Sequence, residues 1–446
     1  MEAIKRGDYA VSKIIKKIDD IYSNEFYDVD VDHFWNTGEQ RELKAHRIHA
    51  YPAKFPAFIF EKGIEYAARE NFYPKMVADI FCGCGTVAFE AKRKEIDFWG
   101  CDINPVATMI ARTKSINYNT RRITDFLNYI LEKFSSDSCN ENTYSDAPER
   151  LQYWYYEKEY NDLVHLKQAI EMTIPVRSSY RLFFYCAFSN ILKSTSRWLT
   201  KSIKPQIDPY KVPANVVAAF STQCHNMINA YEEVNLNNNS RTKIVTGNFL
   251  NQKIKSPKID MIITSPPYVT SYEYADLHQL SSLWLNFTND YRDLRAGSIG
   301  SLYHNINYDI KNGDLSKTGQ HVVSELYKED KRQARSVAKY FFDMQNVIKK
   351  CATILSDDGF LLMVIGDTEY KGVHIENAKH ITELMCLNDF KEITITKRKI
   401  SWKTLTPYRD SLGRFTTNLS SRRVYGEEFI VVGRKNIKQL GRCYLA

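Results

Sequence analysis

One short block constrains the fold more than any other part of this sequence. Residues 76–95 read MVADIFCGCGTVAFEAKRKE. The opening apolar run is typical of a β-strand and ends at Asp79, and the closing residues show helical spacing. Gly83 and Gly85 lie between them, in a chain with only 18 glycines among 446 residues. Strand, glycine turn and helix in this order predict the first unit of a parallel α/β sheet.

A second strand and helix follow at once. Residues 98–101 (FWGC) end at Asp102, and Asn104-Pro105 opens a helix with proline in its favoured first turn. Glycines after one strand let a ligand approach the backbone, and an acid at the tip of the next strand can accept both ribose hydroxyls. These features predict a nucleoside cofactor. A pyrophosphate is less expected, because the third glycine of the dinucleotide fingerprint is missing. A turn of purely structural use is the alternative.

The rest of the chain changes pattern twice. Between residues 118 and 236, long stretches place apolar residues at helical intervals. Strand patterns then return at 242–249, 258–264, 359–367, 390–400 and 427–435. We therefore predict an α/β fold, a doubly wound and mostly parallel sheet with an antiparallel C-terminal hairpin at its edge and a helical insertion. The expected parts are an N-terminal helical extension at 1–45, a main domain at 46–117 and 237–446, and the insertion at 118–236.

A second motif, Thr264-Ser265-Pro266-Pro267-Tyr268, follows a buried strand pattern. Two prolines fix φ twice and remove two amide donors, so the turn is rigid and its carbonyls point outward. Such a turn suits an exocyclic amine of a base. The Ser265 hydroxyl and a proline carbonyl could accept its two N–H protons and free its lone pair, while Tyr268 stacks on the base. The alternative is an ordinary rigid turn.

Taken together, D-x-F-x-G-x-G-T, Asp102 and T-S-P-P-Y resemble the amino-group DNA methyltransferases that use S-adenosylmethionine. S-P-P-Y is similar to the cytosine-N4 group in particular. Residues 46–56 (HRIHAYPAKFP) resemble the family's segment before the first strand, which helps hold the methionine end of the cofactor. Residues 272–285 resemble the stretch after the catalytic turn. The resemblance covers 46–113 and 243–433 and implies a Rossmann-like catalytic domain, with the unmatched insertion as a candidate target-recognition region.

The resemblance also implies roles for individual residues. Those expected at the methionine end of S-adenosylmethionine are Tyr51, Ala53, Lys54 and Phe55. Those expected along the glycine turn and the ribose are Asp79, Phe81, Gly83, Gly85, Thr86, Asp102 and Ile103. Asn248 and Phe249 would flank the adenine. Ser265, Pro266, Pro267 and Tyr268 would be the catalytic residues that hold the target amine.

Several reaction types are excluded by motifs that the sequence lacks. Methylation of a cytosine ring carbon needs a cysteine nucleophile, typically in a Pro-Cys pair, and this sequence has no such pair. The P-C-x-x-C zinc ligands of nucleobase deaminases and the G-x-x-x-x-G-K-[ST] loop of nucleotide hydrolases are also absent. Direct methyl transfer to a nitrogen is left, without a metal. The resemblance implies that this nitrogen is N4 of cytosine at a specific site in double-stranded DNA, with the base flipped. The resemblance adds a restriction-modification or related defence context, with a cognate restriction endonuclease as a candidate partner.

Three alternatives stay open. Adenine-N6 methylation uses the same geometry, usually with Asp or Asn where Ser265 stands. An RNA amine methyltransferase could use the same turn. From another class, the chain could be a non-catalytic DNA-binding or specificity subunit with a cofactor pocket of only structural use.

The net charge of +8 is concentrated at the end of the chain. Residues 393–446 hold 12 Lys and Arg against 3 Asp and Glu, whereas the other 392 residues hold 49 and 50. A basic, aromatic stretch of this kind suits phosphates, and a solvated tail is the alternative. The candidate DNA-binding residues here and in the insertion are Arg197, Lys201, Arg409, Arg414, Arg422 and Arg423.

Composition also indicates the compartment. The nine cysteines show no C-x-x-C spacing, which fits a reducing environment. Charged residues interrupt the first 20 positions, so they lack the apolar core of a signal peptide, and no apolar run approaches 18 residues. We expect a cytoplasmic protein without membrane association.

Overall fold

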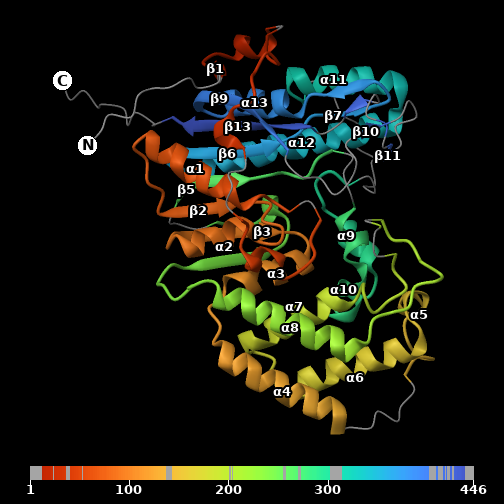
Figure 1. Cartoon of the computed structure of the whole chain (residues 1–446). Coiled ribbons are helices and arrows are strands. Elements are labelled where there is room, and N and C mark those ends of the chain that lie inside the picture. Colours follow the sequence, from red (N-terminus) through yellow and green to blue (C-terminus); the bar gives the residue numbers. More distant parts are fainter. Residues whose placement is uncertain are drawn as a thin grey trace.

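A computed structural model describes residues 13–23, 25–36, 41–52, 54–136, 143–199, 202, 204–254, 258–269, 273–301, 314–400, 408–409, 415–416, 418, 422–423 and 426–436. Its centre is an eight-stranded sheet with the order β1-β9-β13-β6-β5-β2-β3-β4 (Figure 1). The strands are β1 (Lys13–Ile15), β2 (Met76–Asp79), β3 (Asp97–Asp102), β4 (Thr242–Thr246), β5 (Ile259–Thr264), β6 (Leu355–Ile365), β9 (Phe390–Lys399) and β13 (Glu427–Lys435). The five strands from β4 to β6 run parallel, and β13, β9 and β1 add three antiparallel pairings. The predicted fold class is confirmed.

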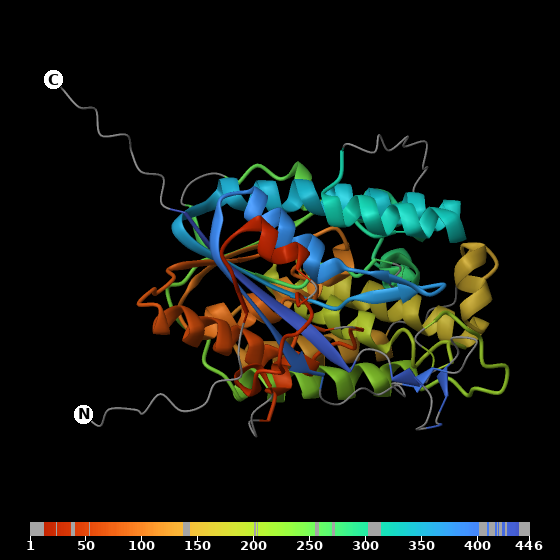
Figure 2. The same ribbon diagram turned by 90° about the horizontal axis from the view of Figure 1, so that it is seen from above.

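Helices cover both faces of the sheet, as a doubly wound fold requires. One face packs against α1 (Ala57–Arg69), α2 (Thr86–Arg93) and α3 (Pro105–Ser115). The other packs against α11 (Lys317–Glu329), α12 (Lys331–Ile354) and α13 (Asn377–Leu387). Figure 2 shows α11 and α12 on one side of the sheet and α1 on the other. Both faces of the central strands are therefore buried, which explains the continuous apolar runs 261–263 in β5 and 360–365 in β6.

The predicted insertion folds into a separate helical layer beyond the β4 side of the sheet (Figure 1). Its helices are α4 (Thr120–Ser136), α5 (Glu149–Trp154), α6 (Glu157–Thr173), α7 (Ser179–Ile191) and α8 (Val216–Glu232). They enclose a core rich in aromatic side chains, which includes Trp154 and Trp198 with ring centroids 4.7 Å apart. The same core takes in Val106 of α3 and Trp284 of α10 (Gln279–Trp284). The layer is thus packed directly onto the main domain.

The N-terminal part differs from the predicted helical extension. Its described residues contain β1 and three short 3-10 helices, η1 (Ile18–Tyr22), η2 (His33–Trp35) and η3 (Lys44–Arg47). Strand β1 pairs antiparallel with β9, with Lys13 opposite Ile395, and the Ile15 side chain is buried. A three-residue strand is too short to show a period in the sequence, so only the partner strand selects this conformation.

The closing hairpin is also placed differently from the edge position expected for it. Strand β13 lies between β6 and β9, and β1 covers the outer side of β9. Residues of the hairpin tip form a small separate sheet of β10 (Tyr408–Arg409), β11 (Phe415–Thr416) and β12 (Arg422–Arg423). The remaining elements are β7 (Thr368–Tyr370), β8 (Val373–Ile375), α9 (Tyr274–Leu277), η4 (Phe249–Asn251) and η5 (Tyr291–Arg295). None of the helices within the described ranges is both long and apolar enough to cross a membrane.

Candidate active site

The glycine turn and the S-P-P-Y turn are joined by a hydrogen bond at the carboxyl ends of two adjacent parallel strands. The Asp79 carboxylate, at the end of β2, accepts from the Thr264 hydroxyl at 2.6 Å and from the amide of Phe81 at 3.1 Å. Asp79 is only 2% exposed, and this burial raises its pKa to about 7, against the lowering effect of the two hydrogen bonds. Asp79 therefore fixes the two motifs relative to each other.

Asp102 ends the neighbouring strand β3 and faces the same glycine turn. One carboxylate oxygen accepts from the Gly83 amide at 2.9 Å, and the other accepts from the Asn104 amide at 2.8 Å. Burial raises the pKa of Asp102 to about 6, partly offset by these two bonds. A carboxylate can accept about four hydrogen bonds, so lone pairs remain for two ribose hydroxyls.

The two glycines of the turn have different structural roles. Gly83 has a φ of 47°, and a side chain there would begin 3.6 Å from the ring of Tyr51. Gly85 has a φ of 76° and approaches α3 so closely that a Cβ would lie 2.5 Å from the Cβ of Ala111. Gly85 thus serves helix packing, whereas Gly83 lies on the side of Tyr51 and Asp102. Thr86 is 2% exposed, and its hydroxyl has no hydrogen-bond partner within the described part of the chain.

The segment before α1 contributes an aromatic wall. The Tyr51 ring lies parallel to His278 with centroids 5.0 Å apart, and nearly parallel to Tyr274 at 6.3 Å. Lys54 donates to the Glu42 carboxylate at 2.7 Å and to the His46 carbonyl at 3.1 Å, so a carboxylate of the protein already binds its ammonium group. Phe55 packs against the core beneath α1. Ala53, predicted beside the same cofactor end, lies outside the described residues.

The expected adenine-binding residues lie at the end of β4. Asn248 caps η4 by accepting from the Leu250 amide, and its amide group donates to the carbonyl of Gly297 at 2.9 Å. Ile103 also lies beside Gly297. Phe249 is only 2% exposed and packs against Trp99 in the core. Ile103 and Asn248 therefore both lie beside Gly297, whereas the Phe249 ring packs into the core.

The S-P-P-Y turn is held by groups that sequence reasoning missed. Tyr268 donates its hydroxyl hydrogen to Glu428 at 2.9 Å, and Glu428 accepts from Arg398 at 2.6 Å. Burial and the Glu428 carboxylate raise the pKa of Tyr268 well above its usual value. Gly366 faces the Tyr268 ring, and a Cβ there would lie 3.3 Å from it. Glu428 and Arg398 stand opposite each other on β13 and β9, a pairing that requires the strand register.

The remaining residues of this turn are partly accessible. Ser265, Pro267 and Tyr268 are half-buried, and Pro266 is buried. Among the described residues, no group of three or more His, Cys, Asp or Glu side chains is arranged to hold a metal ion.

The described candidate DNA-binding residues come from two parts of the chain, the helical layer and the small sheet of the hairpin tip. Arg197 is half-buried, and its guanidinium lies over the Tyr156 ring at 5.1 Å. Its neighbour Trp198 is fully buried, so this basic run is not simply a solvated face. Arg409 pairs with Arg422 across β10 and β12, and Arg423 follows in β12. Lys201 and Arg414 lie outside the described residues.

A family model described as DNA methylase, N6_N4_Mtase, matches residues 5–113 and 259–440. The chain belongs to this DNA methylase family. The two matched blocks hold the glycine turn, Asp102 and the S-P-P-Y turn, and they flank the helical layer in the sequence. The family of amino-group DNA methyltransferases, which the sequence motifs resemble, is thereby shown, and the chain is a methyltransferase.

This DNA methylase is similar along most of its length to curated proteins. It is 24% identical to Type II methyltransferase M.MvaI from Kocuria varians over 430 residues, which cover 90% of this chain and 92% of that protein. It is 23% identical to Type II methyltransferase M.AvaI from Nostoc sp. over 374 residues, 73% of this chain and 74% of the other. A solved structure of the rRNA methyltransferase aviRa from Streptomyces viridochromogenes aligns at 8% identity with a TM-score of 0.27, covering 87% of this chain and 89% of that one.

The geometry fits a methyl donor that carries a nucleoside. Asp102 keeps acceptor capacity for vicinal hydroxyls, and the Thr86 hydroxyl, which no group of the described chain satisfies, offers a further polar contact beside the glycine turn. Tyr51, stacked between Gly83 and His278, supplies a flat apolar wall. The glycine turn, the candidate donor site, and the S-P-P-Y turn, the candidate acceptor site, are linked by the hydrogen bond between Asp79 and Thr264.

Proposed function

We propose that this DNA methylase transfers the methyl group of S-adenosylmethionine to the exocyclic N4 of cytosine in double-stranded DNA. The observation that carries the proposal is the direct hydrogen bond between Asp79 and Thr264, which sets the S-P-P-Y turn beside the nucleoside-binding turn. Two groups that must react in line need this fixed relation, because orientation supplies much of the rate of a direct transfer.

The cofactor would be held at the carboxyl ends of β2 and β3. Asp102 would accept the ribose hydroxyls, Gly83 would allow the close approach, and Tyr51 would cover the methionine end. Bound there, S-adenosylmethionine supplies an electrophilic methyl group on a sulfonium. The residues proposed to contact it further are Phe81, Thr86, Ile103, Asn248, Ala53, Lys54 and Phe55, with Asp79, Gly85 and Phe249 supporting the turn.

The target amine would be held by the S-P-P-Y turn. The Ser265 hydroxyl and the Pro266 carbonyl would accept its two N–H protons, which makes the nitrogen lone pair available for transfer. Pro267 keeps the turn rigid, and Tyr268 would stack on the base. Because the amine of a paired cytosine is buried in the duplex, the base must be flipped out, at a cost of a few kcal/mol.

The biological setting we propose follows from the relatives. M.MvaI, M.AvaI and M.BsoBI are named Type II methyltransferases, and M.BsoBI, from Geobacillus stearothermophilus, is 22% identical to this chain over 294 residues. We infer that this protein modifies one short DNA site in the cytoplasm and is paired with a cognate restriction endonuclease. The basic hairpin tip, with Arg409, Arg414, Arg422 and Arg423, and the insertion residues Arg197 and Lys201 would contact the DNA.

The second candidate is methylation of adenine N6, because the matched family model spans both N6 and N4 enzymes. The serine at position 265, where the N6 group usually has Asp or Asn, favours cytosine. Incubation with isotopically labelled cofactor and host DNA, followed by digestion to nucleosides and mass spectrometry, separates the two. N4-methylcytosine is expected, and N6-methyladenine would move the assignment to adenine.

Two variants test the site itself. We expect Ser265→Ala to lower kcat strongly, because it removes one acceptor of the amine, and Tyr268→Ala to abolish detectable transfer. Cofactor affinity should be unchanged in both. Full activity in the double variant, or no methyl incorporation into any duplex by the wild-type protein, would refute the proposed function.

A further inference from the structure

A series of stacked arginine and aromatic side chains joins the helical layer to the segment that follows the S-P-P-Y turn. The Arg150 guanidinium lies 5.0 Å from the ring centroid of Tyr153 on α5 and 5.4 Å from that of Tyr291 on η5. Arg295 lies 5.7 Å from the same Tyr291 ring. A second pair on the helical layer, Arg197 over Tyr156 at 5.1 Å, extends the series. We call Arg150, Tyr153, Tyr156, Arg197 and Tyr291 the arginine–tyrosine ladder.

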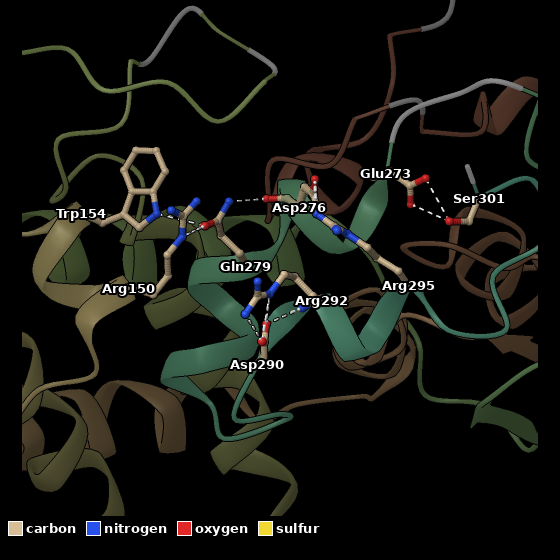
Figure 3. A network of polar contacts seen from close by, with 9 residues as sticks. All are labelled: Arg150, Trp154, Glu273, Asp276, Gln279, Asp290, Arg292, Arg295 and Ser301. Carbon is tan, nitrogen blue, oxygen red and sulfur yellow. Dashed lines mark hydrogen bonds and ion pairs between the residues drawn. The ribbon is translucent and has the colours of Figure 1, made fainter. Parts of the chain in front are cut away.

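Hydrogen bonds fix the ladder to the helices beyond the catalytic turn (Figure 3). The Gln279 side-chain oxygen accepts from Arg150 at 2.7 Å and from the Trp154 indole at 3.0 Å. The Gln279 amide group donates to the Asp276 carbonyl, and the Asp276 carboxylate accepts two bonds from Arg295 at 2.8 and 2.9 Å. Because Gln279 opens α10 and Asp276 lies in α9, the ladder is positioned by the segment that begins five residues after Tyr268.

The aromatic members of the ladder that lie on the helical layer are accessible. Tyr153 is 48% exposed and Tyr156 is 41% exposed, although both rings have a large apolar surface. The loop paired with Arg197, through the bond from the Asp208 amide to the Arg197 carbonyl, carries Tyr210 at 92% exposure. Exposed aromatic rings gathered around cations are unusual on a surface that contacts only water.

The charges of the ladder indicate the partner. In the described ranges neither Arg150 nor Arg197 forms an ion pair with a carboxylate; their polar contacts are with Gln279 and with the Tyr153 carbonyl at 3.5 Å. Aromatic rings lie over both guanidinium groups, the Arg150 Nε donates to Gln279 and the Arg197 Nε is buried, so the terminal N–H groups are those that remain for an anion. Guanidinium edges bind phosphates and base edges, and the rings stack on bases or sugars, so nucleic acid satisfies both kinds of group.

We propose that the arginine–tyrosine ladder binds the target DNA on the insertion side of the flipped base. The inference rests on the proposed function and adds the contact surface that positions the duplex. Arg150 and Arg197 would contact phosphates or base edges, and Tyr153 and Tyr156 would pack against the exposed strand. Hydrogen bonds through Gln279 and Asp276 connect this DNA-contacting surface to α9 and α10 beside the S-P-P-Y turn.

The experiment compares ladder variants with matched surface variants. The ladder variants are Tyr153→Ala, Tyr156→Ala and Arg197→Gln, alone and combined. The controls are Tyr129→Ala on α4, which is 61% exposed, and Tyr73→Ala, which is 74% exposed before β2. The probe is a short fluorescent duplex that carries the site found by mapping methylated host DNA, with a scrambled duplex and a single-stranded RNA of the same sequence alongside.

We expect the combined variant to bind the duplex at least tenfold more weakly than wild type, because each lost base contact of this kind costs roughly that factor. Arg197→Gln should reduce the slope of log affinity against log salt by about 1. The controls should bind within about twofold of wild type by the same measure, since no DNA contact is proposed for them. S-adenosylmethionine affinity, measured by calorimetry, and the melting temperature should stay unchanged in every variant.

The outcomes separate the two proposals. If the wild-type protein binds and methylates the duplex and the ladder variants behave like the controls, the ladder inference fails and the proposed function stands. Loss of cofactor affinity or of melting temperature together with DNA affinity would also overturn the ladder, because it would show a structural role only. A wild-type protein that binds the RNA and neither binds nor methylates the duplex overturns both.

Discussion

At the scale of single residues, the site depends on carboxylates held out of water. Asp79 and Asp102 both receive backbone amide hydrogen bonds, yet burial still raises their pKa values to about 7 and about 6. The pKa of each carboxyl group in the folded protein lies above its ordinary value of 3.8. The contribution of each group to stability is therefore fully present below pH 3.8. This stabilisation is lost as the pH rises through the folded pKa.

Cofactor binding should depend on pH in the opposite direction. In the proposed site the ionised form of Asp102 would accept two ribose hydroxyls, so S-adenosylmethionine should bind about tenfold more weakly at pH 5 than at pH 7, given a pKa of about 6. Calorimetric titration across this range measures the effect. Asp102→Asn should bind weakly at every pH and lose the dependence, whereas Asp79→Asn, which keeps an acceptor for Thr264, should retain it. A flat profile for the wild type would contradict the role of Asp102.

Tyr268 is positioned by Glu428, and this pair makes a second prediction. Tyr268→Phe and Glu428→Gln should each lower kcat by about three- to tenfold, the loss expected for one weakened hydrogen bond. The double variant should be no worse than Glu428→Gln alone, because both changes act on the Tyr268–Glu428 hydrogen bond and only Glu428→Gln also removes the carboxylate that accepts from Arg398. Tyr66→Phe is the control, since it removes a half-buried hydroxyl that contacts Thr394 at 3.2 Å far along β9. Multiplicative losses in kcat would show that Glu428 acts independently of Tyr268.

For residues that belong to contiguous motifs, the sequence predicted the position in the fold. Asp102 beside Gly83, and Thr264 leading into the S-P-P-Y turn, follow from a strand end and the residues next to it. Glu428 and Arg398 could not be found this way, because their pairing depends on the register of β13 against β9. Phe249 was expected beside the adenine and is buried, because a local sequence does not tell which face of an element is covered by a distant helix.

At the scale of elements, the contact of α2 with α3 depends on the absence of one side chain. Gly85→Ala would place a Cβ 2.5 Å from that of Ala111 at a φ of 76°. We expect this change to lower the free energy of unfolding by about 2–4 kcal/mol, from backbone strain and overpacking together. Urea unfolding measures it.

The matched control is Gly372→Ala. Gly372 has a φ of 81°, and a Cβ at this position would meet no atom of the described residues within 4 Å. The control carries the backbone strain without the steric contact, so it should cost only about 1 kcal/mol. Equal losses for the two variants would mean that the approach of α2 to α3 contributes nothing beyond backbone strain.

The elements that the sequence did not predict are short and depend on partners. Strand β1 has three residues and forms only because β9 offers an unpaired edge. The hairpin was expected at the edge of the sheet, and the alternation of polar and apolar residues in β9 fits that position equally well, whereas β13 has a continuous buried apolar run, Phe429–Val432, as in a central strand. Strand order is a property of the assembled sheet, so the pattern of one strand does not identify its neighbours.

At the scale of the whole molecule, the helical layer shares one aromatic core with α3 and α10 of the main domain. Trp284 of α10 packs against Tyr155, Tyr160 and Phe188, and Val106 of α3 belongs to the same cluster. The layer should therefore unfold together with the sheet. Trp198→Ala should cost about 3–5 kcal/mol, the usual loss for a buried aromatic residue.

Hydrogen exchange followed by mass spectrometry tests this cooperativity. Amide protection in α7 and in β5 should fall by the same factor in Trp198→Ala, although Trp198 lies in the helical layer alone. Tyr129→Ala, an exposed change on α4, should leave both unchanged. Loss of protection confined to α4–α8 would show that the layer opens on its own.

The shared core also determines how this enzyme could be re-engineered. A donor helical layer grafted in place of residues 118–236 would meet Leu280 and Trp284, which protrude into it from α10. A grafted layer whose side chains do not complement Leu280 and Trp284 would leave a void or a clash where it meets α10, whichever DNA site it recognises. The part of the chain that must be exchanged together is therefore larger than the inserted segment. It also includes α10 and η5, which follow the S-P-P-Y turn in the sequence.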